Sequence, residues 1–241
     1  MIGFKNFEYA GIIAAGDGAR LRTSYPTFPK PLVPVAGMPL CHWVINSLIQ
    51  AGIKNLTVLL NSRGQAVRES LSSTFPEIRW SFLVQDTASS WESFRLLARA
   101  LSEKSQSFII STVDSLIPPA QVQLFVREAL RRQTGAGLAL TKFIDDEKPL
   151  WADLDPEGLI TALGPQSRLH TYVTAGLYHL AREVVLQMPE AAAHDSLRNY
   201  WISLAENHTP LAGIVLSKTL DVDRPEDIQQ AENFLKEKAL W

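Results

Sequence analysis

The chain has 241 residues, of which 46% are hydrophobic and 20% are charged, a composition typical of a globular protein and not of a disordered or fibrous one. Its 23 basic and 25 acidic residues leave a formal charge of -2, which excludes the strongly basic surface expected of a protein that binds nucleic acid or an anionic membrane. The single cysteine, Cys41, can form neither an internal disulfide nor a Cys-based zinc site, and this favours a cytoplasmic location. No apolar run approaches the ~18 residues needed to cross a bilayer.

The first half of the chain alternates short apolar runs with segments of helical spacing. Five apolar runs predict buried strands, at residues 9–15, 55–60, 79–84, 107–112 and 135–143. Between them, helical spacing predicts one helix that begins at Pro39 and is stopped by Gly52, and three more at residues 65–73, 90–102 and 119–132. Strands separated by helices in this way imply right-handed crossovers and a mostly parallel sheet.

The rhythm changes in the second half. Two apolar runs, at residues 150–154 and 159–163, flank the turn Asp155-Pro156-Glu157-Gly158 and predict an inserted hairpin. The remaining predicted elements are a strand at 172–179, helices at 182–187 and 194–206, a strand at 212–217 and a closing helix at 225–238. We therefore expect one α/β domain over residues 1–241, a three-layer α/β/α sandwich around a mostly parallel mixed sheet.

The junction after the first strand carries the strongest local signal. The run Ala14-Ala15-Gly16-Asp17-Gly18-Ala19-Arg20 leads from a buried strand into a glycine-containing loop. In an open α/β sheet, ligands bind beyond the carboxyl ends of the strands, and glycines let backbone N–H groups approach a phosphate. The run lacks the third glycine of a dinucleotide fingerprint and the Lys-Ser/Thr pair of a P-loop. A tight turn with a solvated Arg20 is the alternative.

A second cation follows on the same loop, since Lys30 stands between Pro29 and Pro31, which restrict the backbone around it. Two cations on one loop suit a polyphosphate. The stretch AAGDGARL, with PTFPKPLVPVAGMPL and AGIKNLTVLLN after it, resembles the N-terminal signature of sugar-1-phosphate nucleotidylyltransferases over about fifty residues. It departs at Ala19, where that family has Ser or Thr. The resemblance implies a Rossmann-like fold of the GT-A type.

The resemblance also implies roles for these residues. The backbone of the loop would hold the nucleobase and ribose of a nucleoside triphosphate, through Ala14, Ala15, Gly16 and Gly18. Arg20 and Lys30 would be the catalytic cations, Arg20 on the triphosphate and Lys30 at the reacting phosphate. Fixed cations suit this chemistry because negative charge on the transferring group and on the departing pyrophosphate must be neutralised.

Two carboxylates at strand ends are candidate ligands of Mg²⁺, a hard cation that prefers oxygen. Asp114 follows the strand at 107–112, where the family has a metal-binding aspartate. Asp223 lies in the segment DVDRPED, which resembles the family's D-[VI]-[DN]-T-P-E-D-L segment that holds the second ligand. A helix cap or turn role is the alternative for Asp114. We expect both carboxylates to meet at one magnesium site.

The acceptor side departs most from the family. Gln85 stands where the family recognises the base, and its amide could pair with a pyrimidine. Thr174 and Gly176 lie in a segment, TAGLY, similar to the N-A-G-[IL]-Y strand of the sugar pocket. The family's Glu-Lys pair before that strand is missing. Arg168 is the first candidate to hold the acceptor phosphate in its place, with Lys142 as the second.

The resemblance thus implies magnesium-dependent transfer from a nucleoside triphosphate, most simply a pyrimidine one, to a sugar 1-phosphate. Residues 1–115 would form the nucleotide-binding half and residues 116–241 the acceptor-binding half of a monomer or small homo-oligomer. Two alternatives remain: another phosphorylated acceptor such as phosphocholine, or a non-catalytic nucleotide-binding subunit with a regulatory or scaffolding role.

Overall fold

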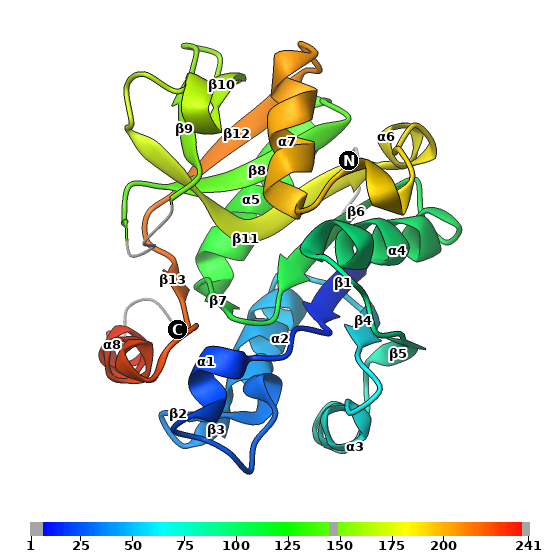
Figure 1. The fold of residues 1–241 in the computed structure, drawn as a ribbon, viewed down its shortest axis with the longest axis vertical. Helices are drawn as coiled ribbons and strands as arrows, with labels where there is room; N and C mark the ends of the chain where they lie inside the picture. The colour runs from blue at the N-terminus through cyan, green and yellow to red at the C-terminus, as the bar shows by residue number, and fades with distance from the viewer. Residues whose placement is uncertain (1–6, 145–148, 238–241) are drawn as a thin grey trace, which may run out of the picture.

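The computed structural model describes residues 7–144 and 149–237, which form a mixed nine-stranded sheet with helices on both faces (Figure 1). The strands are β1 (Tyr9–Ala14), β4 (Asn55–Leu60), β5 (Arg79–Val84), β6 (Ser107–Thr112), β8 (Ala136–Thr141), β9 (Trp151–Leu154), β10 (Ile160–Leu163), β11 (Tyr172–Ala181) and β12 (Leu211–Leu216). The helices are α1 (Ala19–Arg22), α2 (Leu40–Gln50), α3 (Gln65–Thr74), α4 (Ser90–Ser102), α5 (Pro119–Arg132), α6 (Arg182–Leu186), α7 (Leu197–Glu206) and α8 (Pro225–Lys236). The predicted α/β/α architecture is confirmed. In the described ranges, no helix has the length and apolar character needed to cross a membrane.

The sheet has two halves of different strand direction. Strands β6, β1, β4 and β5 lie side by side and pair in parallel. Strand β11 runs antiparallel to β6 and, on its other side, to β8 and β9. The β9–β10 pair is the predicted hairpin, and β12 joins β8 in parallel. The parallel half therefore brings the ends of β1 and β6 to one edge, which is where ligands bind in such sheets.

Apolar side chains on both faces of the sheet explain its burial. Alternate residues of β1 point to opposite faces, so that Ala10 and Ile12 pack into one core and Ile13 packs against the other. The first core lies under α2 and α5, and the second lies under α4 and α7. In α4 the buried residues Trp91, Phe94 and Leu97 recur at helical spacing, as an amphipathic helix requires.

Some boundaries differ from the sequence-based expectation. The stretch between the first predicted strand and the helix at Pro39, for which the sequence predicts no regular element, contains α1, a 3-10 turn at Lys30–Leu32 and the short strand β2 (Pro34–Val35), which pairs with β3 (Met38–Pro39). The helix predicted at 194–206 begins at residue 197 because the hydroxyl of Ser196 caps it by accepting from the N–H of Asn199. Helix α8 ends at Lys236, and residue 238, the predicted end, lies outside the described residues.

The buried His179 of β11 makes fold stability depend on pH. Its Nε2 lies 2.8 Å from Oγ of Ser107, and burial lowers its pKa from 6.5 to about 4. Between pH 6.5 and pH 4 this histidine is protonated in the unfolded chain but neutral in the folded one. The free energy of unfolding should therefore fall as pH drops from 6.5 to 4, by up to about 3 kcal/mol. Urea unfolding at pH 7 and pH 5 should show this fall in the wild type and a smaller one in His179→Gln. Equal falls in the two proteins would assign the acid sensitivity to other groups.

Candidate active site

The loop after β1 turns through Gly18, which has φ 58 and precedes α1. A Cβ atom at this position would lie 2.5 Å from Cβ of Lys30. Only glycine therefore combines the left-handed backbone with this close approach. The loop therefore passes directly beside the side chain of Lys30.

A cavity of about 290 Å³ opens beside the loop. The predicted nucleotide-binding residues Ala14 and Gly16 line it, together with Lys30 and Asn61. Ala15 and Gly18 are not among the lining residues, and the carbonyl oxygen of Ala15 accepts a hydrogen bond from Nδ2 of Asn61 at 3.1 Å. The cavity thus places exposed backbone next to the candidate catalytic lysine, as a nucleotide site requires.

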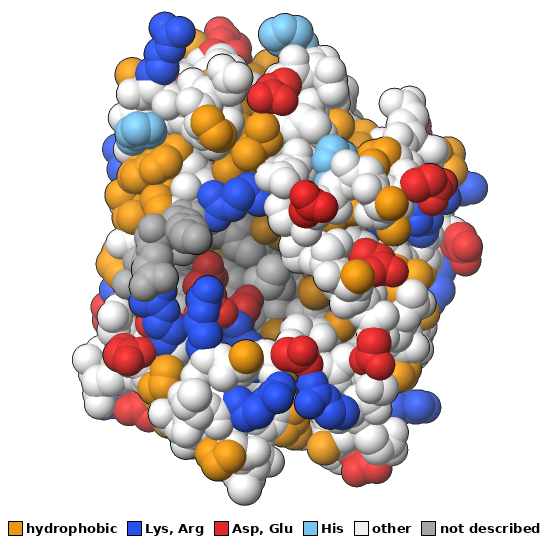
Figure 2. Space-filling model, viewed as in Figure 1, with side chains coloured by type: hydrophobic (Ala, Val, Ile, Leu, Met, Phe, Trp, Pro, Cys, Tyr) orange, Lys and Arg blue, Asp and Glu red, His pale blue; other side chains and the backbone are white. Residues whose placement is uncertain are grey.

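Lys30 joins the predicted metal ligands in one ion cluster. Its Nζ donates to Oδ2 of Asp114 at 2.5 Å and to Oδ1 of Asp223. Its side chain is only 9% exposed, and Nη1 of Arg20 lies 3.9 Å from Oδ2 of Asp223. Because both carboxylates reach one nitrogen, they lie next to each other, although one follows β6 and the other precedes α8. Figure 2 shows acidic side chains inside a hollow and basic ones along its rim.

A short two-stranded ladder brings the two carboxylates together. Strand β7 (Ser115–Leu116) pairs antiparallel with β13 (Leu220–Asp221), and the N–H of Val222 donates to the carbonyl oxygen of Asp114 at 3.0 Å. The side chain of Asp227 then accepts from the N–H of Asp223 at 2.8 Å. These contacts join the start of α8 to the end of β6.

Gly176 of β11 permits this ladder to pack. A Cβ atom at Gly176 would lie 2.1 Å from Oγ1 of Thr112 and 2.8 Å from Cβ of Ser115. The N–H of Gly176 also donates to Oγ of Ser115 at 3.3 Å. Gly176 thus lies directly behind the turn that carries Asp114, and its contact with the acceptor stays a prediction.

The charges of the cluster support one another. Burial opposes the charge of Lys30, but the carboxylates of Asp114 and Asp223 outweigh it and raise the pKa of the ammonium. Burial also opposes the charge of Asp114, and the nearby Lys30 outweighs it, so that the pKa of this carboxyl is lowered. At neutral pH the site therefore holds an ammonium between two carboxylates.

The same two carboxylates are the groups that could hold a divalent ion. Within residues 7–144 and 149–237, no three His, Cys, Asp or Glu side chains form a ligand group. Mg²⁺ commonly uses one or two protein carboxylates and completes its shell with water and substrate phosphates. The pair Asp114 and Asp223 fits an ion of this kind that binds together with a triphosphate.

The predicted acceptor residues separate into two places. Thr174 lines a small cavity with Arg20 and Asp223, next to the ion cluster. Arg168 instead lines a cavity with Glu206 and His208, and its backbone N–H donates to Asp153 at 2.7 Å. The structure therefore does not bring Arg168 to the ion cluster.

Two further predicted residues lie apart from the cluster. The Lys142 ammonium lies 5.5 Å from the centroid of the Tyr172 ring, so it points to that ring. Gln85 follows β5, is exposed, and its backbone N–H donates to the carbonyl oxygen of Leu60 at 2.9 Å. Its contact with a base stays a prediction.

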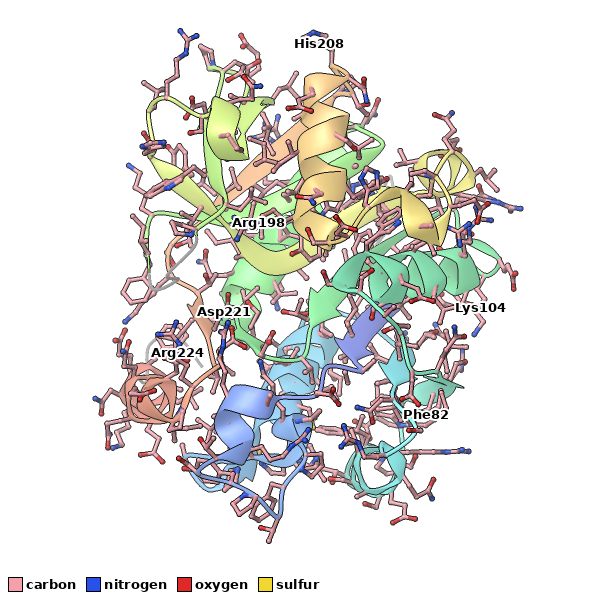
Figure 3. The ribbon with its side chains drawn as sticks, viewed as in Figure 1. Phe82, Lys104, Arg198, His208, Asp221 and Arg224 are labelled. Atoms are coloured by element: carbon pink, nitrogen blue, oxygen red, sulfur yellow. The ribbon has the colours of Figure 1, made fainter. Side chains whose placement is uncertain are left out.

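Two arginines at the cleft were not singled out from the sequence. Figure 3 shows Arg198 on α7 and Arg224 between β13 and α8. Nη1 of Arg198 donates to the carbonyl oxygen of Pro149 at 3.3 Å, and Arg224 lines the same small cavity as Thr174. A sequence signal for Arg224 exists, because the segment DVDRPED has arginine where the resembling family has threonine. Arg198 has no comparable signal.

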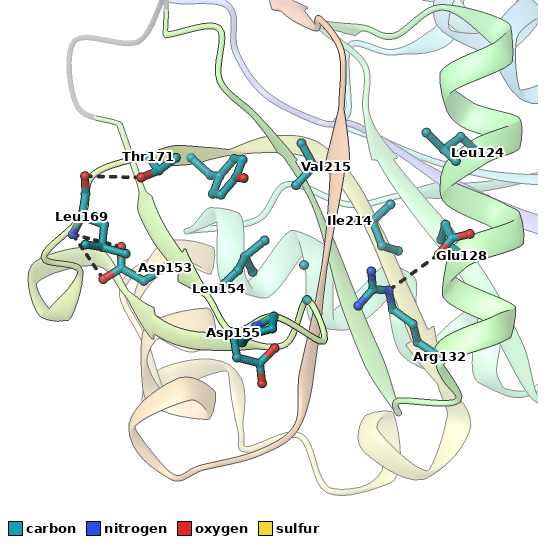
Figure 4. Close-up of a pocket in the computed structure, with 14 residues that line it drawn as sticks. Leu124, Glu128, Arg132, Asp153, Leu154, Asp155, Leu169, Thr171, Ile214 and Val215 are labelled. Carbon is teal, nitrogen blue, oxygen red and sulfur yellow. Dashed lines mark hydrogen bonds and ion pairs between the residues drawn. The ribbon is translucent and has the colours of Figure 1, made fainter.

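A larger cavity, about 720 Å³, lies elsewhere, between α5, β9 and β12 (Figure 4). Its walls include the apolar Leu124, Leu154 and Val215. Nε of Arg132 lies 3.9 Å from Oε2 of Glu128, within the distance of an ion pair. A cavity is a candidate reaction site when ionisable groups cluster in it, and the cluster of ionisable groups in this protein lies at Lys30. The candidate active site is therefore the cavity beside Lys30.

Residues 10–163 match the family of MobA-like NTP transferase domains. The chain is 25% identical over 239 residues to the low-salt glycan biosynthesis nucleotidyltransferase Agl11 of Haloferax volcanii, covering 95% of this chain and 66% of that protein. Among solved structures, it is similar to the inositol-1-phosphate CTP transferase from T. maritima, with TM-score 0.80, 20% identity and coverage of 97% and 98% of the two chains. It also resembles UDP-glucose pyrophosphorylase complexed with UDP-glucose, with TM-score 0.78, 15% identity and coverage of 96% and 99%. Since the family match spans more than half of the sequence, the chain belongs to the MobA-like NTP transferase domain family.

Proposed function

We propose that the protein catalyses magnesium-dependent transfer of a nucleotidyl group from a pyrimidine nucleoside triphosphate to a sugar 1-phosphate, with release of pyrophosphate. The observation that carries the proposal is the hydrogen bonding of Lys30 to both Asp114 and Asp223 beside the glycine loop. Membership of the NTP transferase family supports nucleotidyl transfer. The named activities of the two similar structures support a phosphorylated polyol or sugar as acceptor and a pyrimidine as base.

The reaction needs little covalent help from the protein. A phosphate oxygen of the acceptor forms a bond to the α-phosphorus of the triphosphate, and the bond from that phosphorus to pyrophosphate breaks. Lys30 and Arg20, which both pair with Asp223, would neutralise charge on the transferring and departing phosphates. A magnesium ion held by Asp114 and Asp223, when bound, would supply further positive charge and orient the phosphates.

Two alternatives, transfer to another phosphorylated acceptor and a non-catalytic nucleotide-binding subunit, require different residues at the site. Transfer to phosphocholine would use the same cations, and only the acceptor pocket would differ. A non-catalytic nucleotide-binding subunit needs neither the ammonium nor the carboxylate pair. The convergence of these groups from three separate segments of the chain favours turnover over a scaffold.

A substrate screen tests the proposal. Pyrophosphate release should be measured with MgCl₂ for each of ATP, GTP, CTP, UTP and dTTP against glucose 1-phosphate, myo-inositol 1-phosphate and phosphocholine. We expect the highest rate with CTP, UTP or dTTP and a sugar or polyol phosphate, and loss of the rate on chelation of the metal. A preference for phosphocholine would select the first alternative. Nucleotide binding without pyrophosphate release in any combination would select the second.

A further inference from the structure

Asp17 is an acidic residue in a cavity whose other charged residues are basic. The cavity of about 290 Å³ beside the glycine loop is lined by Arg22, Lys30 and Arg63, and among the described residues of its lining Asp17 is the one acid. The ammonium of Lys30 donates to two carboxylates that lie outside this lining. Arg22 and Arg63 are the two guanidinium groups of the cavity, and Asp17 lies against both of them.

One carboxylate oxygen of Asp17 lies between the two guanidinium groups. Its Oδ1 accepts from Nη2 of Arg63 and lies 3.9 Å from Nη2 of Arg22, which also donates to the carbonyl oxygen of Asp17. Arg22 ends α1, whereas Arg63 stands between β4 and α3, so two separate segments hold this carboxylate. Guanidinium groups bind the oxygens of carboxylates and of phosphates in the same way. Asp17 therefore uses the cations that would otherwise face a phosphate in this cavity.

The contacts of Asp17 are of a kind that a stronger anion can replace. The side chains of Asp17, Arg22 and Arg63 are 70%, 45% and 60% exposed, and solvent screening leaves exposed ion pairs weak. Asp17 also stands between Gly16 and Gly18. A Cβ atom at Gly16 would meet no heavy atom of the described chain within 4 Å, apart from its two chain neighbours. The loop thus has both the space and the glycines needed for Asp17 to move aside.

We propose that Asp17 is a tethered competitor of pyrophosphate, which yields Arg22 and Arg63 to the outer phosphates of the triphosphate and takes them back as pyrophosphate leaves. Pyrophosphate carries more negative charge than one carboxylate and therefore wins these cations when it binds. Asp17 stays at a high effective concentration because the chain holds it beside them, so it favours product release. The inference rests on the proposed function, because pyrophosphate is the product of nucleotidyl transfer, and it goes further by assigning a residue to product release.

Calorimetric titration with inorganic pyrophosphate, without metal and at low ionic strength, tests this competition directly. Asp17→Asn keeps the shape of the side chain but removes its charge. Its Kd for pyrophosphate should be about three- to fivefold lower than that of the wild type, the effect expected when an exposed competing ion pair is lost. In Arg63→Gln, Asp17 has lost one of its two partners, so the further change Asp17→Asn should give a smaller gain there.

Asp86→Asn is the matched control. Asp86 is exposed and accepts from the N–H of Ser62 at 2.9 Å, beside Arg63 in the chain, but it is not among the described residues that line the cavity. Its replacement removes the same charge from the same region and leaves Asp17 on both arginines. The Kd for pyrophosphate should therefore stay within about twofold of the wild type.

Product inhibition gives an independent measurement, with the best substrates from the screen and formation of the nucleotide-linked product followed by chromatography. In Asp17→Asn, the inhibition constant of added pyrophosphate should fall by the same factor as the Kd, whereas the KM of the acceptor should stay within about twofold. If no substrate pair reacts but Asp17→Asn binds pyrophosphate more tightly than the wild type, the proposed function fails and the competition by Asp17 stands.

Three results would overturn the role of Asp17. They are equal or weaker pyrophosphate binding in Asp17→Asn, including no binding by any of the proteins, an equal gain in Asp86→Asn, and an undiminished gain in the Arg63→Gln background. Thermal unfolding shows whether each variant is folded. If Asp17→Asn is not, Asp17→Ser removes the same charge and takes its place.

Discussion

Lys30→Ala should lower the turnover number by roughly 10²- to 10³-fold, with a smaller loss of affinity for the triphosphate. The side chain is 9% exposed and its ammonium donates to two carboxylates, so its charge is fixed in position before substrate binds. A fixed charge stabilises the transition state more than the bound substrate, because it requires no reorganisation when charge shifts between phosphates. Pyrophosphate-release kinetics give the turnover number, and calorimetry gives the triphosphate affinity.

Two further variants make the Lys30 result specific. Lys30→Arg should restore little activity, because a planar guanidinium cannot occupy the place of a compact ammonium beside Gly18 and between two prolines. Lys54→Ala removes an exposed lysine just before β4 and should leave both constants unchanged. An Lys30→Ala protein that keeps its turnover but loses triphosphate affinity would show that Lys30 only binds.

The features that the sequence predicts well are local ones. The buried strand β1, the turn at Gly18 and the rigid segment around Lys30 follow each other within about twenty residues, and each has a residue type that its conformation demands. The helices α4 and α5 likewise begin and end where the apolar spacing places them. For such elements, hydrophobic period and turn chemistry are sufficient.

Convergence of Asp114 and Asp223 was expected from the shared edge of the sheet, but its structural cause was not. It depends on β7 and β13, each of two residues, which are too short for any periodic pattern. The ion pairs of Lys30 are equally hard to predict, because no spacing in the sequence shows that Lys30 reaches both carboxylates. Ion pairs between distant segments depend on the tertiary structure and not on any local sequence pattern.

The acceptor side shows a different kind of limit. The sequence favours Arg168 because it follows the hairpin, yet in the structure it lines a cavity with Glu206 and His208. A loop residue near a strand end can point to either face of the sheet, and chain order does not decide which. Arg224 lies far from the hairpin in sequence, but the β7–β13 pairing brings its segment to the small cavity that Thr174 also lines.

Asp114→Asn and Asp223→Asn should each lower turnover by roughly 10²-fold or more, and should raise the magnesium concentration needed for half-maximal activity. Both amides keep the shape of the side chain but remove the charge that a hard cation requires. The turnover number of the double variant should be little lower than that of the less active single variant. Both carboxylates serve one ion and one ammonium, and the effects of residues that act as a unit are not additive.

Activity measured across a range of MgCl₂ concentrations checks this prediction, with Asp195→Asn, an exposed position before α7, as the matched control. The same magnesium titration, repeated at several acidic pH values, gives a second measurement. Lys30 lowers the pKa of Asp114, so the charge of this carboxylate persists as pH falls through the usual range of Asp and is lost only when pH passes below its lowered pKa. In Lys30→Ala, the loss of metal binding should therefore begin at higher pH than in the wild type. Unchanged magnesium dependence in both aspartate variants, or strictly additive losses, would show that the two carboxylates do not share an ion.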